Sequence, residues 1–359
     1  MRQAQSLLVQ AFCEPTSVAF LEEPQWDLLI RQARRADLLA RLCARLGQYG
    51  SLARAPARAR NHLDSARIAA DQHATTVRWE VRCLKRALSG IELPVILLKG
   101  AAYLLADLPP AQGRLFYDVD ILVPKVRLDE VERALRKHGW SFMHLDAYDQ
   151  RYYRTWMHEL PPLQHLRRRS VVDVHHRILP ETASLKPDAE KMLSASEPLE
   201  EMGGVHVLTP SHMVLHSAAH LFHDGELEHG LCDLADLDAL FRHFGKMPSF
   251  WDELIDSARE LDLMRPLYYA LRYTTRVFAT PVPGRVIDTS KKSAPRVVGK
   301  RCMDALFTRG LAPDHESCND SFSGLARWLL YVRSHYLRMP LYLLIPHLVR
   351  KAVRRQFKE

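Results

Sequence analysis

Three apolar segments in the middle of the chain decide its fold: LPVILLKG at 93–100, YDVDILV at 117–123 and SVVDVHHRI at 170–178. The first is a short apolar run that ends in glycine and is followed by helix-forming residues, so it predicts a buried strand, a turn and a helix. In the second, apolar residues alternate with Asp118 and Asp120, which is the period of a strand. The third has the β-branched composition of another strand. We therefore expect a small mixed sheet with helices.

Helical patterns flank this central segment on both sides. Residues 1–88 show amphipathic helical spacing, and the chain returns to helical patterns from Thr209 onward. We divide the chain into a helical region at 1–88, a sheet-containing core at 89–182 and a C-terminal helical region with a basic tail at 205–359. The predicted fold class is α+β.

Composition narrows the class of protein. The 359 residues are 47% hydrophobic and 26% charged, with 15 Gly and 21 Pro, which excludes collagen-like, low-complexity and wholly disordered chains. No apolar run approaches the roughly 18 residues of a membrane-spanning helix. The six cysteines form no CxxC pair, which favours free thiols in a reducing compartment. We expect a folded, soluble, cytoplasmic protein.

The positive charge is concentrated at one end of the chain. The formal net charge is +8, and residues 324–359 hold eight Lys and Arg against one acid, or +7 of that total. The rest of the chain is nearly neutral. Attraction for phosphate or anionic lipid is therefore expected in the tail, and a general basic surface for nucleic acid is not.

The aspartates of the predicted strands form the strongest chemical signal. Asp118 and Asp120 lie on one face of a strand, about 6 to 7 Å apart, which suits oxygen ligation of a hard divalent cation. Asp173, on a neighbouring strand, would complete a site for two magnesium ions. Phosphoryl and nucleotidyl transfer need such a clamp. An isolated D-x-D, however, is common and usually represents two solvated residues.

The order LLKG, Arg114, DVDILV and VVDVHHRI resembles the polymerase-beta-like nucleotidyltransferase superfamily. More narrowly it resembles a bacterial, largely uncharacterised family, nucleotidyltransferase family 5, over about residues 80 to 280. The resemblance implies that a turn at Gly100 opens a helix that cradles the triphosphate. It also implies that Asp118 and Asp120 bind two Mg²⁺ ions and that Asp173 binds one of them. The implied activity is transfer of a nucleoside monophosphate from an NTP, such as ATP, to an acceptor with release of pyrophosphate.

The turn departs from the wider superfamily. Most members have Gly-Ser or Gly-Gly where this chain has Lys99 and Gly100, although Lys-Gly resembles the narrower family. Gly100 permits close approach of a phosphate to the backbone, and Lys99 adds a positive charge. The alternative is that Lys99 ends a strand and reaches solvent. Arg114 is expected either to contact a phosphate or to pair with a carboxylate.

A second cluster consists of histidines on the helix that begins near residue 210. At helical spacing they fall within about 80° of arc, opposite the apolar side. We count His216 and His220 as candidate nucleotide-binding residues, and a polar helix face or metal ligation as alternatives. No HExxH motif is present, which excludes a zincin. The stripe comprises His212, His216, His220 and His223.

Two other functions compete with nucleotidyl transfer. One is a non-catalytic nucleotide- or partner-binding module, such as half of a toxin and antitoxin pair, against which the retention of all three aspartates argues. The other is a metal-dependent phosphohydrolase. It would need His216, His220, Asp224 and Asp233 to converge.

The sequence does not identify the acceptor or the partners of this protein. Because the chain outside the tail is nearly neutral, we favour a small molecule or a peptide as acceptor over nucleic acid. The tail is expected to pack on the body as a helix with a basic end, or else to contact a membrane surface or a nucleic-acid acceptor. The oligomeric state is not predicted.

Overall fold

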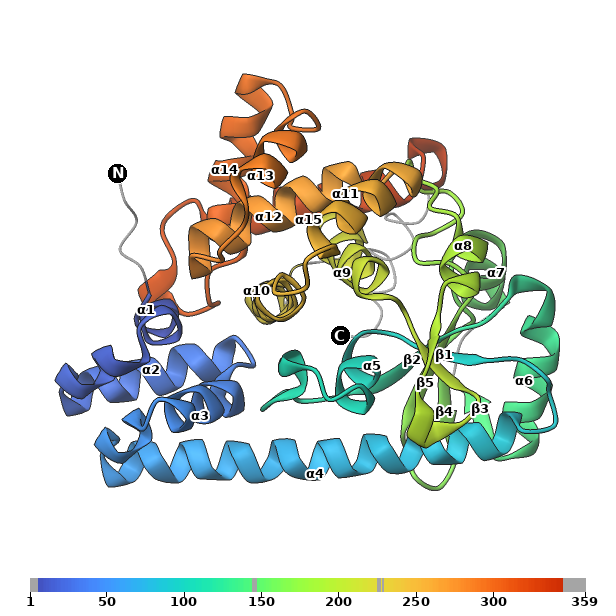
Figure 1. The fold of residues 1–359 in the computed structure, drawn as a ribbon, viewed down its shortest axis with the longest axis horizontal. Coiled ribbons are helices and arrows are strands. Elements are labelled where there is room, and N and C mark those ends of the chain that lie inside the picture. The colour runs from blue at the N-terminus through green and yellow to red at the C-terminus, as the bar shows by residue number, and fades with distance from the viewer. Residues whose placement is uncertain (1–5, 144–146, 225–226, 228, 345–359) are drawn as a thin grey trace.

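The computed structural model describes residues 6–143, 147–224, 227 and 229–344, in which helices surround one mixed sheet of seven strands (Figure 1). The order of the strands across the sheet is β3-β4-β5-β2-β1-β7-β6. Their bounds are β1 (Val95–Leu97), β2 (Asp118–Leu122), β3 (Trp140–Phe142), β4 (Leu163–His165), β5 (Val171–His175), β6 (Glu197–Pro198) and β7 (Val205–Val207). The prediction of an α+β fold with a mixed sheet is confirmed.

The three strands that the sequence predicts, β1, β2 and β5, lie together at the centre of the sheet. All three residues of β1 are buried, and so are all residues of β2 except Asp118. β1 pairs antiparallel with β2 and parallel with β7, and β2 pairs parallel with β5. β5 therefore presents its residues beside those of β2 along the full length of both strands.

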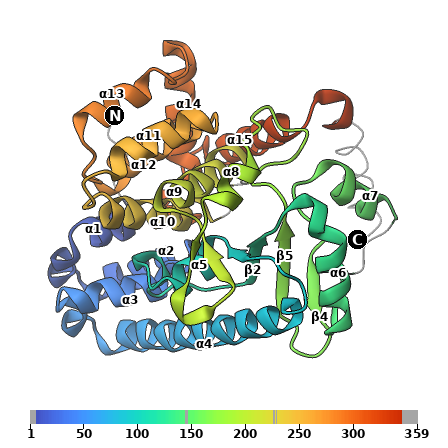
Figure 2. The ribbon, with the colours of Figure 1, turned by 45° about the vertical axis from the view of Figure 1, so that its right-hand side comes forward.

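The N-terminal helices form a layer that leads to the sheet. The 32-residue helix α4 runs along one side of the molecule, from α2 and α3 at one end to β2 and α6 at the other (Figure 1). Figure 2 brings the sheet forward, with α6 beside it, and α6 packs on β3. The helices of this half are α1 (Leu7–Cys13), α2 (Glu23–Arg35), α3 (Leu39–Gln48), α4 (Ala57–Leu88), α5 (Lys99–Leu105), α6 (Leu128–Lys137) and α7 (Ala147–Trp156).

The C-terminal helices pack over α5 and the N-terminal layer. α9 lies between α5 and the pair α11 and α12, and α10 packs on both α9 and α12 (Figure 1). A π-helical turn, His220–Asp224, follows α9 directly. The bounds are α8 (Ala189–Ser194), α9 (Pro210–Ala219), α10 (Gly230–Phe244), α11 (Phe250–Glu260), α12 (Met264–Phe278), α13 (Gly284–Lys291), α14 (Val297–Gly310) and α15 (Ser323–Arg338).

The interpretation of the histidine stripe as a face opposite the core is wrong. Every residue of α9 from Ser211 to Ala219 is buried, because neighbouring helices cover this helix on more than one side. His212, His216 and His223 are all less than 10% exposed. The helical period correctly groups the histidines on one arc, but it does not show that this arc is also covered.

One continuous apolar core joins these layers, from Leu8 in α1 to Leu330 in α15. A buried ion-pair network also connects them. Asp236 of α10 accepts hydrogen bonds from Arg41 of α3, at 2.5 Å, and from Arg114 in the segment before β2. None of the helices in the described part of the chain is both long and apolar enough to cross a bilayer. The basic residues at 350–359 lie outside the described residues.

Candidate active site

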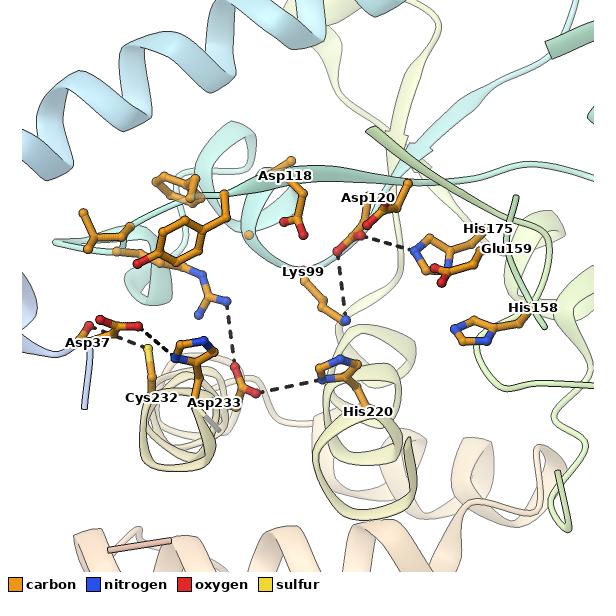
Figure 3. A pocket seen from close by; sticks show the side chains of 18 of the residues that line it. Asp37, Lys99, Asp118, Asp120, His158, Glu159, His175, His220, Cys232 and Asp233 are labelled. Atoms are coloured by element: carbon orange, nitrogen blue, oxygen red, sulfur yellow. Dashed lines mark hydrogen bonds and ion pairs between the residues drawn. The ribbon is translucent and has the colours of Figure 1, made fainter. Parts of the chain in front are cut away.

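A cavity of about 410 Å³ opens where the central strands, α5 and the C-terminal helices meet (Figure 3). Asp37 and Cys232 lie at one end, Lys99, Asp118 and Asp120 near the middle, and His158 and Glu159 at the other end. The remaining lining residues are Gly100, Ala101, Arg114, Leu115, Phe116, Tyr117, Tyr153, Met157, Asp173, His175, His220, His229, Asp233 and Arg338.

Three aspartates from two strands converge in this cavity. Asp120 of β2 is the register partner of Asp173 of β5, and Asp118 lies two residues before Asp120 on the same face. One carboxylate oxygen from each lies within 4.8 Å of the other two. Alternation along β2 places Asp118 and Asp120 on one face, as the sequence predicts. The parallel pairing with β5 then places Asp173 beside them.

The three carboxyl groups have different affinities for protons. Repulsion from Asp120, together with burial, raises the pKa of Asp118 to about 6. Burial and the neighbouring charges of Asp120 and Glu159 raise the pKa of Asp173 to about 8. Burial also opposes ionisation of Asp120, but the Lys99 ammonium and a hydrogen bond from His175 hold the pKa of Asp120 well below its usual range. The metal-free site therefore favours the ionised form of Asp120 and resists ionisation of the other two.

These residues fit a divalent cation. Oδ1 of Asp173 is buried and has no hydrogen-bond partner in the described structure, which is costly for a carboxylate oxygen unless a cation accompanies it. Carboxylate oxygens are the ligands that Mg²⁺ and Mn²⁺ accept most readily. A bound cation would also relieve the repulsion that raises the pKa of Asp118. Asp118, Asp120 and Asp173 are therefore the residues that would hold it.

The Lys99–Gly100 turn lies beside the aspartates. The Nζ of Lys99 is 4.0 Å from Oδ2 of Asp120, and the side chain is largely buried, so it does not simply reach solvent. Lys99 has φ of 40°, which is unfavourable for a residue other than glycine and is often found at functional turns. A Cβ on Gly100 would lie 3.0 Å from a ring carbon of Phe116. A side chain at this position would therefore press on Phe116, which would have to move by a few tenths of an ångström.

Arg114 pairs with carboxylates while it lines the cavity. Its Nη1 donates to Asp236, and its Nη2 is 3.8 Å from Asp233. Of the two alternatives for Arg114, pairing with a carboxylate is therefore realised in this structure. The pairing also fixes the guanidinium at the edge of the cavity, where an anionic group of a ligand can reach it.

The two candidate histidines, His216 of α9 and His220 of the π-helical turn that follows it, differ in their access to the cavity. His220 lines the cavity and lies 3.9 Å from Asp233 (Figure 3). His216 is buried and is not a lining residue. Burial, the positive charge of Lys99 and the neighbouring His220 lower the pKa of His216 well below its ordinary value. His216 is therefore a neutral residue behind the site.

The phosphohydrolase arrangement is not found in the described structure. There, the groups of three or more potential ligands are Asp118, Asp120 and Asp173, and His158, Glu159 and His175. Neither group contains His216, His220 or Asp233, and the side chain of Asp224 lies outside the described part of the chain. Convergence of the aspartates is the outcome that favours a transferase over this hydrolase.

Sequence reasoning missed His158 and Glu159, which lie beside His175 at one end of the cavity. They precede His175 by 17 and 16 residues, respectively, in a segment with no strand pattern of its own. The two histidine rings have centroids 5.2 Å apart. Only the fold brings these residues together.

Carboxylates that can hold divalent cations occur in many enzymes that transfer phosphate-containing groups. The sequence pattern of a family described as uncharacterised nucleotidyltransferase matches residues 22–279, which is well over half of the chain. The chain belongs to this family of nucleotidyltransferases, which confirms the resemblance in the sequence and extends it toward the N-terminus. No curated protein and no solved structure matches the chain.

Proposed function

We propose that this protein transfers a nucleoside monophosphate from an NTP to an acceptor hydroxyl or phosphate and releases pyrophosphate. The observation that carries the proposal is the convergence of three aspartates within 4.8 Å in a cavity that also contains Lys99 and Arg114. Membership of a nucleotidyltransferase family supports the same reaction class and an NTP as donor.

In the proposed reaction each part of the site has one task. Asp118 and Asp120 would hold two Mg²⁺ ions, and Asp173 would share in holding one of them. The chemistry that bound Mg²⁺ supplies is activation of the acceptor oxygen and neutralisation of charge on the leaving pyrophosphate. Lys99 and Arg114 attract the triphosphate, and Gly100 lets it approach the backbone closely.

The bonding changes are those of a substitution at phosphorus. The acceptor oxygen forms a bond to the α-phosphorus, and the bond between that phosphorus and the oxygen leading to the β-phosphate breaks. Pyrophosphate leaves with that oxygen, and the proton of an acceptor hydroxyl passes to a neighbouring carboxylate.

The remaining candidate residues act around this centre. His220 reaches the cavity between Asp233 and the middle of the site, where it can donate to a phosphate or ribose oxygen (Figure 3). His216 supports the site from behind as a neutral side chain. We propose a small molecule or a peptide as acceptor, since the net charge of the chain outside residues 324–359 is close to zero.

The experiment that tests this proposal uses NTPs labelled with radioactive phosphorus at two different positions. Purified protein is incubated with Mg²⁺, an extract of small molecules and peptides, and each NTP in turn. Label at the α-phosphate should appear in an acceptor product, and label at the γ-phosphate should appear in pyrophosphate. If only the γ-label is transferred, the enzyme is a phosphotransferase and the proposal is wrong.

A matched pair of variants makes the result specific to the site. Asp118→Asn should stop transfer, whereas Asp107→Asn, an exposed aspartate that does not line the cavity, should leave it unchanged. The non-catalytic alternative predicts NTP binding without a labelled product in either protein. No observation in the described structure favours that alternative over transfer.

A further inference from the structure

A second group of potential metal ligands lies beside the aspartates and is made of different atoms. One ligand atom from each of His158, Glu159 and His175 lies within 4.8 Å of the other two. Both histidines are at most 6% exposed, and all three residues line the cavity (Figure 3). A partly buried carboxylate beside two buried imidazoles is a possible ligand set and does not resemble a solvated surface cluster.

The backbone holds the three residues in place. Glu159 and His175 face one another in an antiparallel bridge next to β5. The amide of Leu160 donates to the carbonyl of Val174 at 2.9 Å, and the amide of His176 donates to the carbonyl of His158 at 2.9 Å. The segment before Leu160 is therefore fixed to β5, and the two elements present their ligands from a rigid frame.

We propose that His158, Glu159 and His175 bind one divalent transition-metal ion of the Zn²⁺ or Co²⁺ class. The ligands would be Nδ1 of His175, a ring nitrogen of His158 and a carboxylate oxygen of Glu159. Nδ1 of His175 lies 3.4 Å from Oε2 of Glu159. Two ligand atoms at about 2.1 Å from a tetrahedral Zn²⁺ ion are themselves about 3.4 Å apart.

The second ring nitrogen of His175 lies beside a carboxylate, as the second nitrogen of a metal-bound histidine usually does. Nε2 of His175 is 3.2 Å from Oδ1 of Asp120. Metal-bound histidines commonly donate their second ring N–H to a carboxylate, which fixes the tautomer and the orientation of the ring. In this arrangement the transition metal would orient Asp120 through His175. It would thus act as a positioning group for the aspartate cluster.

The two clusters differ in the kind of ion they select. The aspartates offer oxygen atoms alone, which suits Mg²⁺. Imidazole nitrogens favour Zn²⁺, Co²⁺ and related ions over Mg²⁺. Three protein ligands leave coordination positions of the ion open, as catalytic Zn²⁺ sites do, and these residues line the same cavity as the aspartates. The inference rests on the geometry of His158, Glu159 and His175 and does not depend on the proposed transfer reaction.

The competing explanation needs no metal. His175 can be an imidazolium that lies between the carboxylates of Asp120 and Glu159, with His158 packed against it. The two explanations predict opposite results when the protein is given a transition metal, because an imidazolium has no lone pair for an ion.

The test is titration of chelator-treated wild-type protein with Co²⁺ alone, without NTP or Mg²⁺. We expect one equivalent to bind that a large excess of Mg²⁺ does not displace, with visible absorption of a low-coordinate Co²⁺ site and strongly shifted proton resonances from two imidazole rings; Co²⁺ held by the aspartates alone should give way to Mg²⁺. Zn²⁺ should displace the signal. No saturable binding, or shifted resonances from no histidine, would overturn the proposal.

Variants identify the ligands. His158→Gln and Glu159→Gln should each weaken Co²⁺ binding at least tenfold, and His158→Gln should leave shifted resonances from a single imidazole. His212→Gln replaces a buried histidine outside the cavity and should bind Co²⁺ like the wild type. Asp118→Asn should also retain Co²⁺ while it loses transfer, so failure of the proposed function and failure of this site are distinguishable. Unchanged affinity in both ligand variants would contradict the assignment.

Discussion

Asp120 of β2 and Asp173 of β5 are direct register partners in a pair of parallel strands. Because side chains alternate along a strand, Asp118 lies on the same face as both. A shift of the register by one residue would turn Asp173 to the other face of the sheet and divide the cluster. The site thus depends on one strand pairing, which the apolar residues on the opposite face, such as Val172 and Val119, keep in place.

Replacement of Asp118 by Asn should abolish transfer without loss of the fold. The substitution removes a charge from the proposed metal site at nearly constant volume, and it also removes the repulsion from Asp120 that raises the pKa of Asp118. We expect turnover to fall by roughly a hundredfold or more, and the melting temperature in chelator to stay the same or rise. Asp120→Asn should lose activity similarly. Steady-state assays and thermal melts check both, and near-normal turnover would contradict the assignment.

Asp173→Asn should affect chemistry more than NTP binding. Lys99, which would attract the triphosphate, lies 4.0 Å from Asp120, and Figure 3 shows it apart from Glu159, whose charge acts on Asp173. We expect the turnover number to fall roughly a hundredfold, with the dissociation constant of the NTP within a few-fold of wild type. Equilibrium titration beside the activity assay separates the two effects. Complete loss of NTP binding would show that Asp173 is needed for the donor nucleotide.

Without metal, the protein should become less stable between about pH 7 and pH 8. In the folded state the pKa of Asp173 is about 8 and that of His175 is about 9, both above the ordinary values of these side chains. The folded protein therefore holds more protons than the unfolded chain in this window, and stability falls as pH rises. Asp120, with its lowered pKa, contributes only at much lower pH.

We expect the free energy of unfolding in chelator to drop by about 1 to 2 kcal/mol across that pH unit. Urea denaturation at both pH values measures it. Asp173→Asn should show a shallower dependence, since one of the two groups is gone. Added Mg²⁺ should stabilise the wild type more at the higher pH, because ions compete with protons for the carboxylates. A metal-free protein that is equally stable at both pH values would contradict the raised pKa of Asp173.

Gly100→Ala should weaken NTP binding, because the new methyl group would press on side chains at the edge of the cavity. Its Cβ would lie 3.0 Å from Phe116 and 3.4 Å from Nε of Arg114, so both would shift at the edge of the cavity. We expect about a tenfold higher dissociation constant for NTP, or about 1.4 kcal/mol. Gly90→Ala is a matched control, since nothing lies within 4 Å of its Cβ. Equal affinities in both variants would argue against a phosphate role for this turn.

The central strands could be predicted from the sequence, but their partners could not. Alternation of apolar residues with Asp118 and Asp120, and the β-branched run around Asp173, are local signals that are strong in this chain. The outer strands β3, β4, β6 and β7 are two or three residues long, which is too short for a period to be visible. β4 and β7 satisfy backbone hydrogen-bonding groups of the central strands, and β3 and β6 pair in turn with β4 and β7.

The site was predictable only where its residues lie on those strands. Asp118, Asp120 and Asp173 could be found because alternation assigns each to a face, whereas His158 and Glu159 enter the cavity through a long-range bridge that no local pattern encodes. Thr209 is correctly placed as the residue before α9, yet its hydroxyl makes no capping hydrogen bond. Helix starts can thus be predicted from residue type even where the expected contact does not form.

The last prediction concerns the identity of the acceptor and the last ten residues of the basic tail, 350–359, which the structure does not describe. Deletion of these ten residues removes five basic side chains, Arg350, Lys351, Arg354, Arg355 and Lys358. If the tail holds a polyanionic acceptor, binding of a labelled RNA oligonucleotide should lose up to about 3.5 units of its logarithmic salt slope, at about 0.7 for each phosphate contact. NTP binding should be unaffected, because the proposed donor site is built from residues of the cavity. If the slope is unchanged and only the melting temperature falls, the tail packs on the body and nucleic acid is not the acceptor. We expect this second result, since the remainder of the chain carries a net charge close to zero and offers little to attract a polyanion.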